Sequence, residues 1–150
     1  MRIFIDADAC PVRSETIKIA QRHEIKTFIV SNGGIRPIRD QLTETVLVCE
    51  GPDEADKWII LNIKQSDILV TADLPLAYQA IQKNSFVVSY DGKQINGENI
   101  TGKLATRNLM ENIRGADPFL LSSSKFFSKK DRIRFMNLLE KLIQTIKKSL

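Results

Sequence analysis

The chain is poor in cysteine and histidine and has no long apolar run. Its two cysteines, Cys10 and Cys49, lack the spacing of a zinc site or of a disulfide framework, so reduced thiols are expected. No apolar run approaches the roughly 18 residues that a membrane-spanning helix needs. The first apolar run also reaches an aspartate too early for a secretory signal. We therefore expect no membrane segment and a cytoplasmic location.

Size and composition indicate one folded domain. The chain has 150 residues, of which 43% are hydrophobic, enough to bury one core. Its net charge of +4 is uneven, since residues 122–150 hold eight Lys or Arg against two acids and residues 1–121 hold fourteen against sixteen. A basic segment beside an acidic site suits a phosphate-bearing polymer, although a solvated helix face explains the same charges. We predict a single domain over 1–150, with 122–150 as a basic C-terminal helix packed on it.

Short strand-like runs alternate with helical patterns along the chain. This alternation is typical of a parallel sheet with helices on both faces, that is, of an α/β three-layer sandwich. The stretch 31–45 contains Asn-Gly-Gly and Arg-Pro and is expected to be a loop. The expected strands are 2–5, 26–30, 46–49, 67–71 and 86–90, and the expected helices are 11–23, 53–64 and 74–83.

The last helix has a recognisable start. Ser128 is followed three residues later by Asp131, which approximates a capping box. Apolar residues then recur at helical spacing, which indicates a face packed on the sheet. These residues are Phe135, Leu138, Leu139, Leu142 and Ile146.

Asp6 and Asp8 follow the first apolar run and precede Pro11, which can open a helix. If the run is a strand, its period of two points both carboxylates to the same side. Two such charges repel by very roughly 4 kcal/mol at about 4 Å and an effective dielectric near 20, and a divalent cation relieves that repulsion. The alternative is that Asp8 only caps the following helix.

A second acidic segment begins the helix expected at 53–64. Asp53 and Asp56 are three residues apart and share a helix face, whereas Glu54 is rotated by about 100° and is expected to point to solvent. The alternative is that these acids only complement the helix dipole.

A third acidic segment is the strand expected at 67–71, which has an aspartate near each end. Ligands of open α/β sheets bind beyond the carboxyl ends of the strands, which selects Asp73, supported by Thr71, and leaves Asp67 as a structural residue. If the first strand lies beside this one, Asp6, Asp8 and Asp73 converge, and the helix at Asp53 closes the site. Oxygen-only donors suit Mg²⁺ or Mn²⁺ across a scissile phosphate.

Four motifs resemble the bacterial YaiI/YqxD family: Asp-Ala-Asp-Ala-Cys-Pro-Val at 6–12, Asp-Glu-Ala-Asp at 53–56, the run from Asp67 to Ala77, and Asp-Arg-Ile-Arg-Phe at 131–135. That family is described as uncharacterised and as similar to PIN-like and NYN nuclease domains. The resemblance implies a parallel sheet ordered 3-2-1-4-5 and an acidic metal site. It implies that three acidic positions of PIN-like domains correspond to residues of this chain. The first-strand acid would be Asp6, the helix acid Asp53 or Asp56, and the fourth-strand acid Asp73, with Thr71 nearby. Asp8 and Cys10 belong to the family's own motif, and Asp8 could bind metal, cap the helix or position a water.

The resulting prediction is a divalent-metal-dependent nuclease that hydrolyses phosphodiesters, with RNA as the favoured partner. The predicted catalytic residues are Asp6, Asp8, Asp56 and Asp73, and Asp53 joins them as a metal ligand. Arg132, Arg134 and Lys125 are the candidate phosphate contacts, with structural ion pairs as the alternative for the two arginines.

Two other functions stay open. One is a non-catalytic PIN-like domain that binds nucleic acid or a partner. The other is a phosphatase of the haloacid dehalogenase type, in which Asp6 would be the nucleophile and Asp8 the acid/base, although Cys10 departs from that motif.

Three further residues are discounted. Cys10 could have a lowered thiol pKa before a helix, but no histidine is nearby in the sequence. We expect His23 on the surface and Trp58 in packing.

Overall fold

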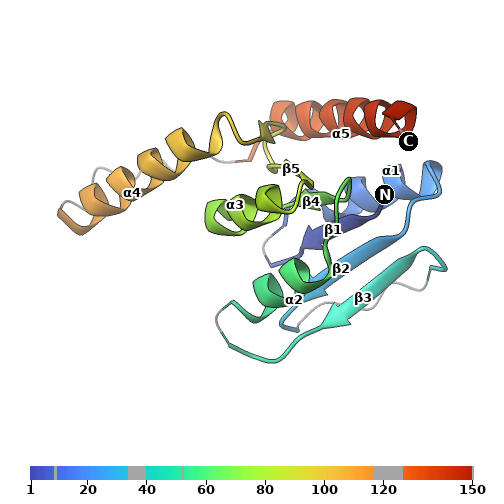
Figure 1. Ribbon diagram of the computed structural model, residues 1–150, viewed down its shortest axis with the longest axis horizontal. Helices are drawn as coiled ribbons and strands as arrows, with labels where there is room; N and C mark the ends of the chain where they lie inside the picture. Colours follow the sequence, from blue (N-terminus) through green and yellow to red (C-terminus); the bar gives the residue numbers. More distant parts are fainter. Residues whose placement is uncertain (9, 34–39, 52, 117–126, 150) are drawn as a thin grey trace.

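The computed structural model describes residues 1–150 except 9, 34–39, 52, 117–126 and 150. Its centre is one six-stranded sheet with the order β3-β2-β1-β4-β5-β6 (Figure 1). The strands are β1 (Ile3–Asp6), β2 (Thr27–Ser31), β3 (Thr43–Leu47), β4 (Ile68–Val70), β5 (Phe86–Val88) and β6 (Gln94–Ile95). The helices are α1 (Arg13–Arg22), α2 (Glu54–Asn62), α3 (Leu74–Gln82), α4 (Ile100–Ala116) and α5 (Lys129–Ser149).

The first five strands are parallel, and β6 pairs with β5 in the antiparallel sense. β1 lies between β2 and β4, with Ile3 opposite Thr27 on one side and Ile68 on the other. The predicted order 3-2-1-4-5 is therefore confirmed, and β6 extends it. Because the carboxyl ends of β1, β2 and β4 lie at one edge, residues that follow these strands meet there.

β1 is buried on both faces, as a central parallel strand should be. Ile3 and Ile5 belong to a core cluster with residues of α1 and α5, whereas Phe4 belongs to a second cluster with residues of α2 and α3. The two clusters lie on opposite faces because successive strand residues alternate. Figure 1 shows α1 beside α5, and α4 extending away from the sheet at the left.

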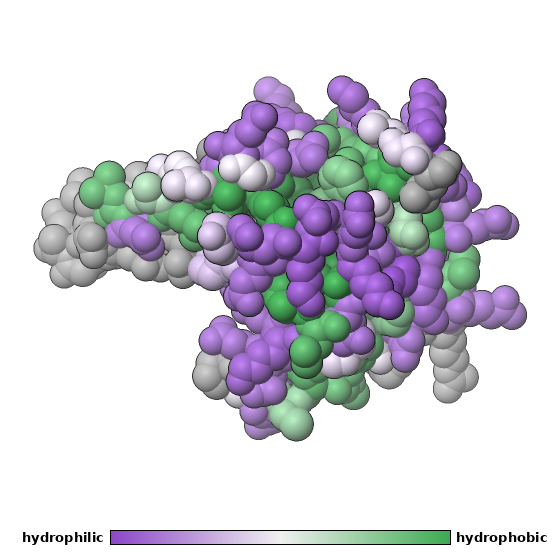
Figure 2. Space-filling view, in the orientation of Figure 1, coloured by the Kyte–Doolittle hydropathy of each residue, from purple (hydrophilic) through white to green (hydrophobic). Residues whose placement is uncertain are grey.

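The face of the molecule seen in Figure 2 is mainly hydrophilic, with apolar residues continuing onto α4. Within the described residues, no helix is long and apolar enough to cross a membrane.

The C-terminal helix begins with the predicted capping box. The Ser128 backbone N–H donates to Asp131 Oδ2 at 3.0 Å, and the Asp131 N–H donates to Ser128 Oγ at 3.2 Å. Four of the five predicted apolar residues are buried, and Leu138 is half-buried against the same cluster. α5 runs from Lys129 to Ser149, and its buried residues share a core cluster with Ile3 and Ile5 of β1; residues 122–126 of the predicted helix lie outside the described residues.

Replacing Ser128 with alanine should lower the free energy of unfolding by about 1 kcal/mol, because one N–H in the first turn of α5 loses its acceptor. Urea titration of wild type and variant measures the difference. Ser149→Ala, at the other end of the same helix, is the control and should change stability by less than about 0.5 kcal/mol. Equal effects of the two substitutions would contradict a capping role.

Asp67 has the structural role predicted from its place at the amino end of β4. Its carboxylate accepts from the Arg2 backbone N–H at 2.9 Å, from Arg2 Nη2 at 2.7 Å and from the Lys64 N–H at 2.8 Å. The side chain is only 4% exposed. Asp67 therefore ties β1 to β4 at the edge opposite the predicted site.

Several sequence expectations need correction. The third strand begins at Thr43, not at 46, so the end of the expected loop 31–45 is wrong. β6 and α4 were not predicted. Thr43–Leu47 is a partly exposed strand at the edge of the sheet. Its first three residues are polar, so the sequence lacks the apolar run that indicates a strand.

Candidate functional site

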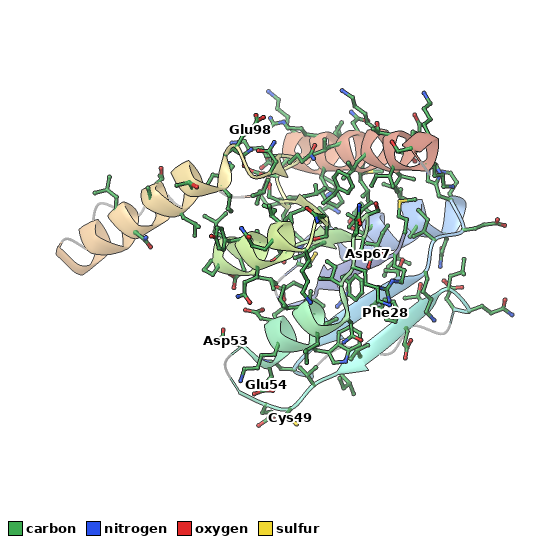
Figure 3. All side chains as sticks on the ribbon, viewed as in Figure 1. Phe28, Cys49, Asp53, Glu54, Asp67 and Glu98 are labelled. Atoms are coloured by element: carbon green, nitrogen blue, oxygen red, sulfur yellow. The ribbon has the colours of Figure 1, made fainter. Side chains whose placement is uncertain are left out.

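All five predicted aspartates line one pocket of about 520 Å³ at the carboxyl edge of the sheet. The remaining lining residues are Asn32, Ala55, Ala72 and Tyr90. Figure 3 shows Asp53 at the start of α2 and Asp67 well away from it; Asp67 directly precedes β4 and so lies at the amino ends of the strands. The aspartates that line the pocket are Asp6, Asp8, Asp53, Asp56 and Asp73.

Asp6 ends β1 and is half-buried. Its Oδ2 accepts a hydrogen bond from Thr71 Oγ1 at 2.9 Å. Its backbone carbonyl accepts another from the Tyr90 hydroxyl, also at 2.9 Å. Both the side chain and the main chain of Asp6 are therefore fixed by residues that follow β4 and β5.

Thr71 links Asp6 to Asp73. Its hydroxyl donates to Asp6 and accepts from the Asp73 backbone N–H at 3.0 Å. Asp73 is the N-cap of α3, and its Oδ1 accepts from the Leu76 N–H at 3.1 Å. The cap holds one carboxylate oxygen of Asp73 and so fixes the carboxylate at the pocket wall.

Asp53 and Asp56 reach the pocket from the start of α2. Asp53 has a left-handed backbone conformation, with φ of 66°, and its side chain does not cap the helix. Asp56 lies in the first turn, three residues on, and is half-buried. Glu54 is absent from the pocket lining and pairs with Lys57 at 3.4 Å. The predicted division between Asp53 and Asp56 on one side and Glu54 on the other is therefore observed.

Asp8 is exposed at the pocket rim. Ser31 Oγ, at the end of β2, lies 3.4 Å from its Oδ1. α1 begins after Val12 without a side-chain cap, and in the part of the chain that the structure describes no backbone N–H of α1 donates to Asp8. The alternative that Asp8 only caps this helix is wrong.

Burial and the neighbouring negative charges raise the pKa of two of the five aspartates, Asp6 and Asp56. Burial raises the pKa of Asp6 to about 6, and the charges of Asp56, Asp8 and Asp73 add to that effect, against the hydrogen bond from Thr71. Burial also raises the pKa of Asp56 to about 6, assisted by the charges of Asp73, Asp53 and Asp8. Within the described ranges, no lysine or arginine forms an ion pair with any of the five aspartates. The pocket therefore concentrates negative charge that the described cations do not neutralise.

These raised pKa values predict that the cation-free protein becomes less stable as the pH rises from about 4 to about 6. Between these pH values the carboxyl is ionised in the unfolded state but still protonated in the folded state. Deprotonation of the folded state therefore lowers the free energy of unfolding as the pH rises through this interval. At pH 7 we expect the double variant Asp6→Asn/Asp56→Asn to be more stable than wild type by about 1–3 kcal/mol, with the half-exposed Asp56 giving the smaller, solvent-screened share.

At pH 4 the two proteins should be nearly equal in stability. Urea unfolding in the presence of EDTA at both pH values measures this difference. Added Mn²⁺ should stabilise the wild type at pH 7, by about 2.7 kcal/mol at a hundred times Kd, and should leave the double variant unchanged. A stability difference that does not vary with pH would contradict the electrostatic account.

The donors of the pocket are carboxylate oxygens, which suit Mg²⁺ or Mn²⁺ better than softer metals. In the described part of the chain, no three His, Cys, Asp or Glu side chains are arranged to hold one ion between them. Mg²⁺ commonly keeps several waters and uses one or two carboxylates together with substrate phosphate. The residues fit that mode of binding, and metal binding stays a prediction.

Cys10 does not have the lowered pKa expected for a thiol before a helix. Burial raises the pKa of its thiol to about 11, and the charge of Asp6 raises it further. Burial also raises the pKa of the neighbouring Tyr90 phenol. A thiolate nucleophile at Cys10 is therefore disfavoured at neutral pH.

Two of the predicted phosphate contacts, Arg132 and Arg134, lie outside the lining of the acidic pocket. Arg132 forms an ion pair with Glu15, and its guanidinium lies 5.3 Å from the centre of the Phe127 ring. Arg134 lies 3.7 Å from Asp131 in the same helix. Lys125 is outside the described residues. Contact of these residues with nucleic acid stays a prediction.

His23 and Trp58 lie in packed positions. Trp58 packs on Phe4 and Phe28, with ring centres 6.0 and 5.8 Å away, as expected. His23 Nε2 lies 2.8 Å from Glu140 Oε2 and its side chain is 18% exposed, so it joins α1 to α5 and is not a free surface residue.

Four residues of the pocket lining were not predicted: the polar Asn32 and Tyr90, and the small Ala55 and Ala72. Asn32 follows β2 directly, and Tyr90 lies two residues after β5. The same rule that selected Asp73, the position just beyond a strand's carboxyl end, could have selected both.

The fold and pocket define an α/β protein with an acidic site at the carboxyl edge of a parallel sheet. The chain belongs to the uncharacterised bacterial YaiI/YqxD family, whose sequence profile matches residues 4–145. It is similar to a UPF0178 protein of Roseobacter denitrificans, with 46% identity over 142 residues, covering 95% of this chain and 94% of the relative. UPF0178 proteins of Ruegeria pomeroyi and Parvibaculum lavamentivorans are 43% and 40% identical, covering 95% and 97% of this chain and 93% and 95% of the relatives. No solved structure gives a significant match.

Proposed function

We propose that this protein is a divalent-cation-dependent nuclease that hydrolyses phosphodiester bonds, with RNA as the favoured substrate. One observation carries the proposal. Carboxylates that come from the end of β1, the start of α2 and the start of α3 line one pocket, where burial and the neighbouring negative charges raise the pKa of Asp6 and Asp56. Repulsion among these carboxylates favours binding of a hard cation such as Mg²⁺. A cation bound there could also bind a phosphate group of a nucleic acid.

One or two of Asp6, Asp8, Asp53 and Asp73, together with waters and the substrate phosphate, would hold Mg²⁺ or Mn²⁺, which would neutralise negative charge on the scissile phosphate. The chain's own residues supply orientation. Thr71 and Tyr90 hold the side chain and the carbonyl of Asp6, and the α3 cap holds Asp73.

Asp56 is suited to proton transfer because its pKa, about 6, lies close to neutral pH. It is half-exposed and so is accessible to water in the pocket. We assign it the role of general base toward the attacking water.

The preference for RNA rests on the likeness to PIN-like domains and on the charge of the C-terminal helix. Arg132 and Arg134 lie in the first turns of α5 and are about half-exposed, so their guanidinium groups can reach solvent. Such cations would contact the polymer backbone away from the cleaved bond.

The test is incubation of the purified protein with Mn²⁺ or Mg²⁺ and, separately, with labelled RNA, single-stranded DNA and a generic phosphate monoester. EDTA-sensitive cleavage of RNA supports the proposal. Monoester turnover with an aspartyl-phosphate adduct would indicate the phosphatase instead. Salt-sensitive binding of RNA without turnover would indicate a non-catalytic binding domain.

A further inference from the structure

A second, larger groove adjoins the acidic pocket. Its volume is about 1020 Å³, and it shares Ala72 and Tyr90 with the pocket. It is bounded by the start of α3, the β5–β6 turn, α4 and the start of α5. A group bound in the groove would therefore be a direct neighbour of a group bound in the pocket.

Tyr90 forms the wall between the two spaces. Its hydroxyl donates to the Asp6 carbonyl at 2.9 Å and its half-buried ring packs against the core cluster of β1, which fixes the ring where both spaces meet. The Ser89 N–H donates to the Lys93 carbonyl at 2.9 Å, and this turn keeps Tyr90 in place after β5. A ring fixed in this way can stack on a flat group without a large loss of side-chain entropy.

The chemistry of the groove suits a base better than a phosphate. Its apolar lining includes Leu74, Ile95 and the rings of Tyr90 and Phe127. Among the described residues of its lining, the charged ones are three acids, Asp91, Glu98 and Asp131, and one cation, Lys103. Asp91 also pairs with Lys93, and Asp131 with Arg134, neither of which is in this lining. Acids repel phosphate groups, whereas carboxylates accept hydrogen bonds from the amino groups of bases and aromatic rings stack on their faces.

We propose that this groove holds an unpaired base next to the phosphodiester bound in the acidic pocket, with Tyr90 as the stacking surface. This inference rests on the proposed function and specifies its substrate as a single-stranded nucleic acid. In a duplex the bases are paired and stacked, so none could enter a groove lined by rings and acids beside the cleaved bond. The volume is sufficient for a nucleoside, since typical sites for small ligands are about 300–1,000 Å³.

The test compares four variants of the full chain on an RNA 12-mer whose cut position is first mapped with wild type. In matched substrates, a tetrahydrofuran spacer replaces the base on either side of that bond. Tyr90→Leu removes the ring, and Tyr90→Phe keeps the ring but loses the hydroxyl. Thr106→Trp fills the groove from an exposed position on α4. Tyr78→Leu changes the other tyrosine, which is 43% exposed on α3 and outside both spaces, and is the matched control.

With wild type, one of the two spacers should lower kcat/KM by roughly five- to a hundredfold, the range expected for loss of one base stack. Tyr90→Leu and Thr106→Trp should lower kcat/KM for the intact RNA by a similar factor. In these two variants the spacer should cause no further decrease in kcat/KM. Tyr90→Phe and Tyr78→Leu should keep the spacer penalty. A blunt-ended duplex should be cut at least tenfold more slowly than the single strand.

The inference is overturned if the spacer penalty persists in Tyr90→Leu and Thr106→Trp, or if neither spacer affects wild type. If wild type cleaves nothing, the proposed function fails, and the groove is judged by binding alone. Fluorescence anisotropy then compares an intact 12-mer with one made entirely of spacers. Tighter binding of the intact strand by wild type, lost in Tyr90→Leu and kept in Tyr78→Leu, supports the base site, and equal binding rejects it.

Discussion

Asp6→Asn should reduce the rate of RNA cleavage by about a thousandfold at saturating Mn²⁺, equivalent to about 4 kcal/mol of transition-state stabilisation. Asparagine keeps the size of the side chain and can still accept from Thr71, so the loss isolates the charge. Asp73→Asn should give a loss of similar size. Single-turnover cleavage of labelled RNA by folded protein, checked by circular dichroism, measures both.

Two further variants make this result specific. Asp40→Asn makes the same chemical change outside the pocket, at a carboxylate held by Gln21 and Thr43, and should leave the rate unchanged. Thr71→Val removes the hydrogen bond to Asp6 and should lower the rate by about 10- to 100-fold, as is typical for a residue that orients a metal ligand. An Asp6→Asn variant as active as Asp40→Asn would eliminate the pocket as the site of cleavage.

Gly92→Ala should destabilise the protein by about 3 kcal/mol or more. Gly92 lies in the turn between β5 and β6 with φ of +82°, a conformation that other residues rarely adopt. A Cβ there would lie 2.5 Å from the Phe135 nitrogen and 2.6 Å from the Arg134 carbonyl carbon. Because both atoms belong to the backbone of α5, the helix itself would have to move.

Gly102→Ala is the matched control for this substitution. Gly102 lies within α4, and a Cβ there meets no atom within 4 Å, so alanine should be neutral or should stabilise by up to about 1 kcal/mol. Urea unfolding of the three proteins gives the comparison. A Gly92→Ala variant as stable as wild type would show that α5 does not pack closely on this turn.

The strands of the sheet were predictable to the extent that they were apolar. The runs that form β1, β2, β4 and β5 are buried, and their apolar composition indicated both their type and their approximate bounds. β3 begins with Thr-Glu-Thr at the edge of the sheet, and β6 has only two residues, so neither carried enough apolar signal. α4 (Ile100–Ala116) was not predicted, although with 17 residues it is longer than α1, α2 and α3.

The aspartates of the candidate site were predictable because their positions follow from strand ends and one helix turn. Asp6 and Asp73 required that β1 and β4 be neighbours, which the alternation of elements left open and the resemblance to PIN-like domains implied through the strand order 3-2-1-4-5. The thiol pKa of Cys10 was not predictable in the same way. A helix start lowers a thiol pKa and burial raises it, and only the folded structure shows that burial is the larger effect here.

The ion pair between Arg2 and Asp67 has a consequence for the chemistry at the far end of the same two strands. It anchors the pairing in which Ile3 faces Ile68 and Ile5 faces Val70, and that alignment brings the next residue, Asp6, level with Thr71. A slip by a single residue would shift the Asp6 carboxylate by about 3.3 Å and turn it to the opposite face. Arg2 is not among the described residues that line the pocket, and yet its ion pair fixes the register of β1 and so the position of the Asp6 carboxylate.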